Sequence, residues 1–121
     1  MRDWETAMGD VSDDGGDPVF CATVLYPHKE GSSFDFAHYA GTLAPMYARF
    51  LADNCIKFEV RKGLVTPGRP NPAFICIASY WVKSREEYWA SLGDPRMKDI
   101  MAQFAAFTDI EPIRQFDEVV A

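Results

Sequence analysis

Two segments of this chain are apolar at almost every position, and they constrain the fold more than any other feature. The first is PVFCATVLY at residues 18–26, and the second is AFICIASYWV at residues 73–82. Both are far too short to cross a membrane. A strand that is apolar on both of its alternating faces must be covered on both sides. The sequence therefore predicts two central strands of a sheet.

Between these strands, residues 35–65 predict a helix and then a further strand. Asp35 is placed to cap the helix, because its carboxylate can accept a backbone amide of the first turn. The buried stripe of the helix is predicted from its three- and four-residue spacing to be Phe36, Tyr39, Ala40, Leu43, Met46, Tyr47, Phe50 and Leu51. Residues 56–65 alternate apolar and charged side chains, which is typical of a strand with one wet face. The three prolines of TPGRPNP, residues 66–72, exclude a regular strand there.

The last third of the chain predicts two more helices and a strand. Ser84 and Glu87 form the S-x-x-E pattern that opens a helix, and Asp94 with Pro95 suits the start of another. A final strand is expected at about residues 111–120. The resulting order, β-α-β-β-α-α-β, predicts an α+β fold of the ferredoxin-like class, in which helices cover one face of an antiparallel sheet.

Charge is concentrated at the N-terminal end. Residues 1–17 hold six of the 18 acidic residues and one of the 12 basic residues, so most of the net charge of −6 belongs to them. This acidic segment lacks apolar periodicity and is predicted to be a flexible tail. Residues 18–121 then form a single, nearly neutral domain, which argues against nucleic acid as a partner. No apolar run is long enough for a membrane span.

The predicted sheet also calls for a partner. Helices can cover only one of its faces, whereas the two central strands are apolar on both. A second copy of the chain, packed sheet against sheet, is the simplest symmetric cover for the other face. We therefore expect a homodimer that encloses a barrel-like core, a dimeric α/β barrel.

No strong chemical motif is present. The two histidines and three cysteines lack metal-ligand spacing, and no phosphate-binding glycine loop or nucleophile elbow occurs, so neither a metal nor a cofactor is predicted. The odd number of cysteines indicates reduced thiols and a cytoplasmic location. His28 and His38 are expected in a solvated loop and on a polar helix face. Asp109 and Glu111 could form an acid-base pair, although turn residues more often cap their own backbone.

Several segments together resemble the EthD family, which is named for ethyl tert-butyl ether degradation. They are VLYP, EGSSFD, HYAGTLAP, AFICIASYWV leading into SREEYWA, and above all FTDIEPIRQFDEVV. The resemblance implies the dimeric barrel and a link to oxidative degradation. Related barrels include haem-binding proteins and cofactor-free monooxygenases. Haem is disfavoured here, because neither histidine is expected to face the interior.

The resemblance also implies a site in the first helix, where the family carries a Y-Y-x-x-x-H-x-P pattern. Tyr39 and Pro45 match its second tyrosine and its proline, whereas His38 replaces the first tyrosine and Leu43 replaces the histidine. A leucine cannot carry a proton, so any catalysis would depend on tyrosine, carboxylate or the substrate's own reactivity. From the sequence, the chain's status as an enzyme stays open.

We expect a pocket for a small apolar or aromatic molecule between the first helix and the sheet. We predict that Tyr26, Tyr39 and Tyr80 supply hydroxyls to this pocket and that Leu43, Met46 and Phe107 form its apolar walls. Asp109 is expected at its mouth. One hypothesis is an EthD-like binding protein of oxidative degradation or biosynthesis, which could act as a cofactor-free oxidoreductase. The alternative is a non-catalytic accessory or binding protein that keeps the fold and has lost the histidine at position 43.

Overall fold

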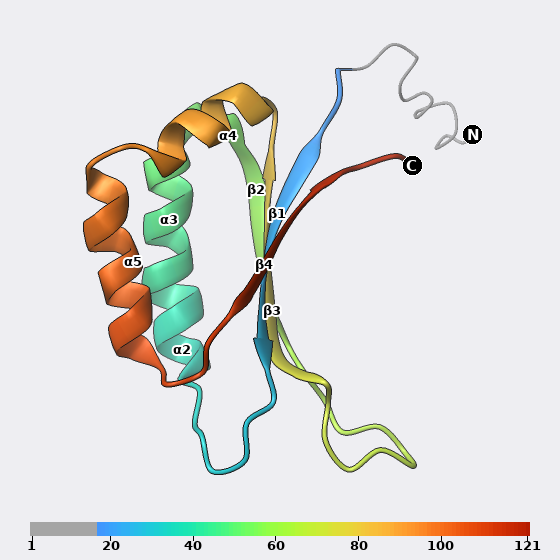
Figure 1. The fold of residues 1–121 in the computed structure, drawn as a ribbon. Helices are drawn as coiled ribbons and strands as arrows, with labels where there is room; N and C mark the ends of the chain where they lie inside the picture. Colours follow the sequence, from blue (N-terminus) through green and yellow to red (C-terminus); the bar gives the residue numbers. More distant parts are fainter. Residues whose placement is uncertain (1–16) are drawn as a thin grey trace.

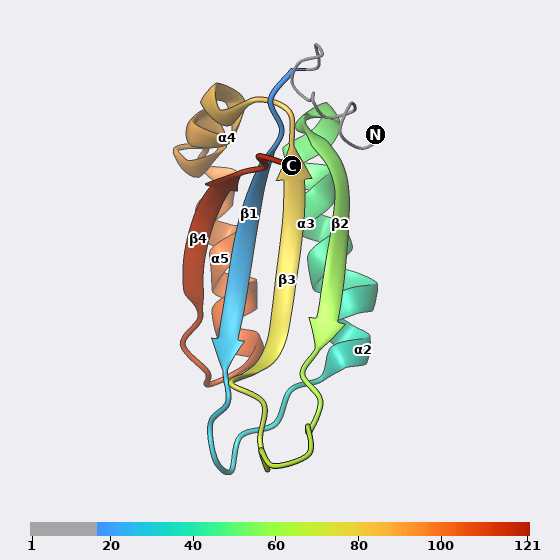
Figure 2. The ribbon, with the colours of Figure 1, turned by 90° about the vertical axis from the view of Figure 1, so that its right-hand side faces the viewer.

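The computed structural model describes residues 17–121, so the predicted tail lies, but for its last residue, outside the described part. A four-stranded antiparallel sheet carries its helices on one face (Figure 1). The strands are β1 (Phe20–Pro27), β2 (Cys55–Lys62), β3 (Phe74–Val82) and β4 (Ile113–Glu118). Their order across the sheet is β2-β3-β1-β4, with the two apolar strands in the centre (Figure 2). This order confirms the predicted ferredoxin-like fold.

Two strands are shorter than the sequence predicts. β2 ends at Lys62, where the chain leaves the sheet for the proline-containing loop that extends below it in Figure 1. β4 begins at Ile113, directly after Pro112, which has no amide hydrogen to donate to a neighbouring strand.

The helices are α2 (Phe36–His38), α3 (Ala44–Leu51), α4 (Arg85–Leu92) and α5 (Arg96–Phe107). Helices α2 and α4 begin directly after the predicted capping residues, whereas α5 begins at Arg96, one residue later than Asp94 and Pro95 predict. Asp35 accepts a hydrogen bond of 3.0 Å from the amide of His38, and Ser84 accepts one of 3.1 Å from the amide of Glu87. Within residues 17–121, every helix is too short or too polar to span a lipid bilayer.

The predicted first helix is interrupted before its proline. A π-helical turn, Tyr39–Leu43, separates α2 from α3, and the amide of Ala44 donates to the carbonyl of Tyr39, five residues back. Pro45 accounts for this change, because its nitrogen cannot donate to the carbonyl of Gly41 as a continuous α-helix would require.

The π turn alters which side chains the helical segment buries. Four predicted stripe residues are buried at a regular spacing of four, namely Tyr39, Leu43, Tyr47 and Leu51. The prediction is wrong for Ala40, which is exposed, while Ala44 is buried in the core. The reason is that the π turn contains one residue more than an α-helical turn, so the apolar face moves around the segment.

Asn54 ties the end of α3 to the start of α4. After α3 the chain turns at Ala52 with a φ of 58°, a conformation that residues with a Cβ rarely adopt. The buried Asn54 then accepts hydrogen bonds from the amides of Lys83 and Ser84 at 3.2 and 2.8 Å. Its own amide donates to the carbonyl of Ser84 at 3.0 Å.

The opposite face of the sheet, which Figure 2 shows from the front, is less apolar than the sequence pattern predicts. Strand pairing places one polar row across it, formed by Gln115, Thr23, Ser79 and Glu59. The ammonium of Lys57 lies 4.4 Å from the ring of Trp81, and Arg61 donates to the hydroxyl of Ser79 at 3.2 Å. Long charged side chains of β2 therefore cover part of the apolar centre of this face.

Candidate functional site

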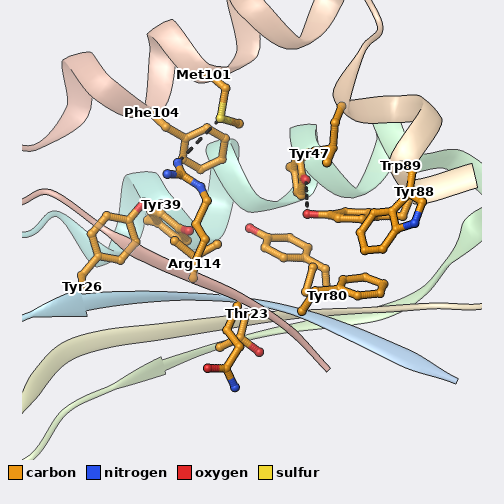
Figure 3. A pocket seen from close by; sticks show the side chains of 15 residues that line it. Thr23, Tyr26, Tyr39, Tyr47, Tyr80, Tyr88, Trp89, Met101, Phe104 and Arg114 are labelled. Carbon is orange, nitrogen blue, oxygen red and sulfur yellow. Dashed lines mark hydrogen bonds between the residues drawn. The ribbon is translucent and has the colours of Figure 1, made fainter. Parts of the chain in front are cut away.

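A cavity of about 250 Å³ lies between the helices and the helix-bearing face of the sheet (Figure 3). All five tyrosines of the chain line it, together with Trp89, Phe104 and Phe116. Helices α4 and α5 contribute its outer wall, and strands β1, β3 and β4 contribute its floor. An apolar cavity of about 150 Å³ already accommodates a benzene ring. This one therefore has room for a larger aromatic molecule.

Strand pairing forms the floor of the cavity. In the register of the sheet, Ala22 of β1 lies between Tyr80 of β3 and Phe116 of β4. The methyl group of Ala22 leaves open the space that these two rings border. Tyr26 follows on the same face of β1, because side chains along a strand alternate with a period of two.

The helices supply the remaining aromatic walls. Tyr39 comes from the π turn and Tyr47 from α3, and the hydroxyl of Tyr47 donates to the hydroxyl of Tyr88 on α4 at 3.3 Å (Figure 3). Trp89 is 50% exposed and packs on Phe116, with 4.7 Å between the ring centroids. The cavity thus reaches the surface beside Trp89, between α4 and the edge strand β4.

Two phenol hydroxyls in the cavity lack a partner. Tyr39 and Tyr80 are 0% and 1% exposed, and neither hydroxyl has a hydrogen-bond partner among the described residues. Figure 3 shows both directed into the cavity. A buried polar group left without a partner costs about 1–3 kcal/mol. These hydroxyls are therefore the groups that a bound molecule would satisfy most favourably.

Burial also keeps these phenols neutral. Loss of hydration raises the pKa of Tyr39, Tyr47 and Tyr80 above the ordinary tyrosine value. Neighbouring phenols add to the rise for Tyr39 and Tyr47, whereas Tyr39 offsets part of it for Tyr80. Near pH 7 they can donate hydrogen bonds but cannot serve as bases. Arg114 is a cation, and the described lining contains no carboxylate, imidazole or thiol. The described lining therefore offers neutral hydrogen-bond donors and one cation to a bound molecule.

The predicted pocket residues are only partly gathered here. Three of them line the cavity, namely Tyr26, Tyr39 and Tyr80. Leu43 is 1% exposed and lies within the core cluster instead. Met46 and Phe107 are half-buried and pack against that cluster, with the ring of Phe107 5.6 Å from that of Tyr39. The apolar walls come from α4, α5 and β4 rather than from these three side chains.

Asp109 lies in an adjoining hollow of about 310 Å³, which shares Tyr26, Met101, Phe104 and Arg114 with the cavity. Its carboxylate accepts hydrogen bonds from the hydroxyl of Ser32 at 2.9 Å and from the ammonium of Lys29 at 3.2 Å. These partners, Ser32 foremost, lower the pKa of Asp109. Glu111 lines the same hollow, but within residues 17–121 no hydrogen bond joins it to Asp109. Asp109 therefore ties two loops together instead of forming an acid-base pair.

Neither histidine lines the cavity. His38 is exposed on α2, as its place on the polar helix face predicts. His28 is half-buried in the loop after β1, where its Nε2 lies 3.6 Å from the carboxylate of the exposed Glu30.

The predicted lining leaves out the residues of the last three elements. They are Tyr88 and Trp89 of α4, Met101 and Phe104 of α5, and Arg114 and Phe116 of β4. One signal for the last pair exists in the sequence IRQFDE, because residues two apart in a strand share a face. That face could be identified only from the pairing of β4 with β1.

Models of known protein families give no match to the chain, and no curated protein matches it. Solved structures do match. An EthD-like protein from Ralstonia eutropha JMP134 is 31% identical, with a TM-score of 0.79, over 88% of this chain and 96% of its own. The chain belongs to the EthD-like family.

Two more distant structures share the fold of this EthD-like protein. An ethyl tert-butyl ether degradation (EthD) family protein from Bacillus halodurans C-125 is 15% identical, with a TM-score of 0.65, over 84% of this chain and 98% of its own. SnoaB, a cofactor-independent oxygenase from Streptomyces nogalater, is 13% identical, with a TM-score of 0.51, over 88% of this chain and 94% of its own. In this EthD-like chain, Leu43 occupies the position where the resemblance implies a histidine, and it is packed in the core.

Proposed function

We propose that this protein binds one small apolar or aromatic molecule in the tyrosine-lined cavity. The observation that carries the proposal is the pair of buried hydroxyls, Tyr39 and Tyr80, that have no partner among the described residues. Both are neutral and can donate to an oxygen atom of the ligand, while the surrounding rings remove its apolar surface from water. The favoured ligand therefore combines an aromatic skeleton with at least one oxygen.

A competition assay tests this proposal. N-phenyl-1-naphthylamine, which fluoresces in apolar surroundings, serves as the reporter, and neutral 1-naphthol serves as the competitor that carries an oxygen. We expect the double variant Y39F/Y80F to bind 1-naphthol about tenfold more weakly, because two donors are lost, and to bind the reporter within about twofold of the wild type.

Y47F is the matched control, because the hydroxyl it removes already donates to Tyr88. It should leave the affinity for 1-naphthol within about twofold of the wild-type value. The proposal is wrong if the wild type binds neither compound, or if Y39F/Y80F binds 1-naphthol as tightly as the wild type does.

The lining favours binding over catalysis as the function. Among the described residues, it holds phenols and one guanidinium but no carboxylate, imidazole or thiol that could serve as a general base. The second candidate, cofactor-free oxidation, would have to draw on the substrate's own reactivity toward dioxygen. It is supported by the shared fold with SnoaB. Consumption of dioxygen with an autoxidisable substrate, lost in Y39F/Y80F, would favour this second function.

We also propose that the open sheet face pairs with a second copy of the chain. Leu25, Ile77 and Trp81 of the two central strands support this, as does Ile113 on β4, which is 53% exposed. Sedimentation velocity at micromolar concentration tests the homodimer. A stable monomer would contradict it.

A cytoplasmic location is part of the same proposal. It is supported by the three cysteines, which are all free thiols. Burial raises the pKa of Cys76 to about 12, so this thiol stays protonated and inert. Fractionation of cells followed by immunodetection tests the location, and enrichment outside the cytoplasm would overturn it.

A further inference from the structure

Arg114 is the basic side chain among the residues that line the cavity. It stands on β4 opposite Val24, on the face that carries the helices, and its side chain extends toward α5 (Figure 3). It also lines the neighbouring hollow that holds Asp109. Its guanidinium therefore stands between two spaces that a ligand can enter.

Arg114 is exposed, and the described residues leave most of its guanidinium N–H groups free to bind a ligand. Within residues 17–121, the hydrogen bond of Arg114 goes to the sulfur of Met101 at 3.7 Å, and a thioether is a weak acceptor. In the same part of the chain, Arg61, Arg85 and Arg96 each have a carboxylate oxygen within 4.0 Å. No such partner is found there for Arg114.

The nearest acidic side chains do not take this role. Asp109 shares the adjoining hollow, but its carboxylate is held by Ser32 and Lys29. Glu111 lines the same hollow and forms no ion pair with Arg114 among the described residues. A guanidinium presents a planar fork of donors that matches the two oxygens of a carboxylate. Such a fork, beside a cavity of aromatic rings, is suited to an aromatic acid.

We propose that Arg114 binds an anionic oxygen group of the ligand, so that the preferred ligand is an aromatic or apolar acid rather than a neutral compound. This inference rests on the proposed function, because it assigns a charge to the molecule that the cavity binds. The phenols of Tyr39, from the wall of the cavity, and Tyr80, from its floor, are then donors to the same molecule. Arg114 fixes which end of the ligand faces the opening beside β4.

The test compares two competitors with the same ring system. 1-Naphthoate carries a carboxylate and 1-naphthol is neutral, and both displace N-phenyl-1-naphthylamine from the full-length protein. We expect R114M to lower the affinity for 1-naphthoate about tenfold and to change the affinity for 1-naphthol by less than about twofold. R114K keeps the charge and should recover part of the lost affinity. R49M is the matched control, because Arg49 is exposed on α3 and does not line the cavity.

The outcomes separate the two proposals. If R114M lowers the affinity for both competitors equally, or for neither, the assignment of Arg114 to an anion is overturned. The dependence of 1-naphthol binding on Tyr39 and Tyr80 would still support the binding function. If the wild type binds none of the three compounds, the binding function and this inference both fail. Circular dichroism checks that R114M is folded, and R114Q replaces it if it is not.

Discussion

The hydroxyls of Tyr47 and Tyr88 lie 3.3 Å apart and join α3 to α4 beside the cavity. Among the described residues, α4 has no buried side chain, so few interactions hold it. Besides the contact of the two hydroxyls, these interactions include the stacking of Tyr88 on Phe116, with ring centroids 4.8 Å apart, and the hydrogen bonds of Asn54 to Ser84. Helix α4 is therefore the least firmly attached wall of the cavity.

The first prediction concerns this attachment. Y88F keeps the ring and removes one hydroxyl, so the buried hydroxyl of Tyr47 loses its acceptor. We expect a loss of about 1 kcal/mol in the free energy of unfolding, together with faster hydrogen exchange at the amides of α4. Urea titration and exchange mass spectrometry measure the two effects. The double variant Y47F/Y88F should lose less unfolding free energy than the sum of the losses in the two single variants. If the two losses simply add, the hydroxyls do not interact.

The second prediction is a gain of stability from the removal of buried hydroxyls. Y39F and Y80F each delete a hydroxyl without a partner among the described residues, and each should raise the unfolding free energy of the ligand-free protein by about 1 kcal/mol. Y47F should lower it, because that hydroxyl is bonded. Thermal and urea unfolding measure the changes. A loss of stability in Y39F would mean that its hydroxyl has a partner in solution.

The third prediction follows from the raised pKa values of Tyr39, Tyr47 and Tyr80. Above the ordinary tyrosine pKa, the unfolded chain releases these protons and the folded chain retains them. The free energy of unfolding therefore keeps its full value below about pH 10 and falls above it. The slope is up to about 1.4 kcal/mol per pH unit for each phenol that stays neutral. Urea unfolding between about pH 9 and 11 measures the slope, which Y39F/Y80F should reduce. Ionisation of all the tyrosines near pH 10 in the folded protein, followed by ultraviolet absorbance, would contradict this.

The fourth prediction uses the strained turn after α3. Ala52 has a φ of 58° and is exposed, so A52G relieves the backbone without removing a buried contact. We expect a gain of about 1 kcal/mol in the free energy of unfolding, since the relief of strain exceeds the entropy cost of glycine. A40G, at an exposed position of the π turn, is the control and should lose up to about 1 kcal/mol. Equal losses in both variants would show that Ala52 is not strained.

The sequence was sufficient to predict the fold because local patterns and global packing agree in it. The apolar runs around Val24 and Ala78 became the two central strands, and the caps at Asp35 and Ser84 start the helices as expected. The π turn was not predicted, because Pro45 indicates a break but does not specify how the chain accommodates it.

The site was harder to predict than the fold for a geometric reason. Tyr26 and Tyr80 can be predicted because they lie in the two apolar central strands, and Tyr39 because it lies on the apolar face of the first helix. Leu43 belongs to such a face too, but periodicity does not distinguish a filled core from a cavity wall. Arg114 is a charged residue on the inner face of an edge strand, and only the register of β4 against β1 places it at the cavity.

The π turn places its extra residue on the solvent side of the molecule. Five residues, not four, separate its hydrogen-bonded ends, which are the carbonyl of Tyr39 and the amide of Ala44. Tyr39 and Leu43, which bound the turn, are both buried, whereas Gly41 and Thr42 between them are exposed. A difference in chain length at this point of the surface would therefore be taken up by exposed residues, and the ligand-facing hydroxyl of Tyr39 would stay in the cavity.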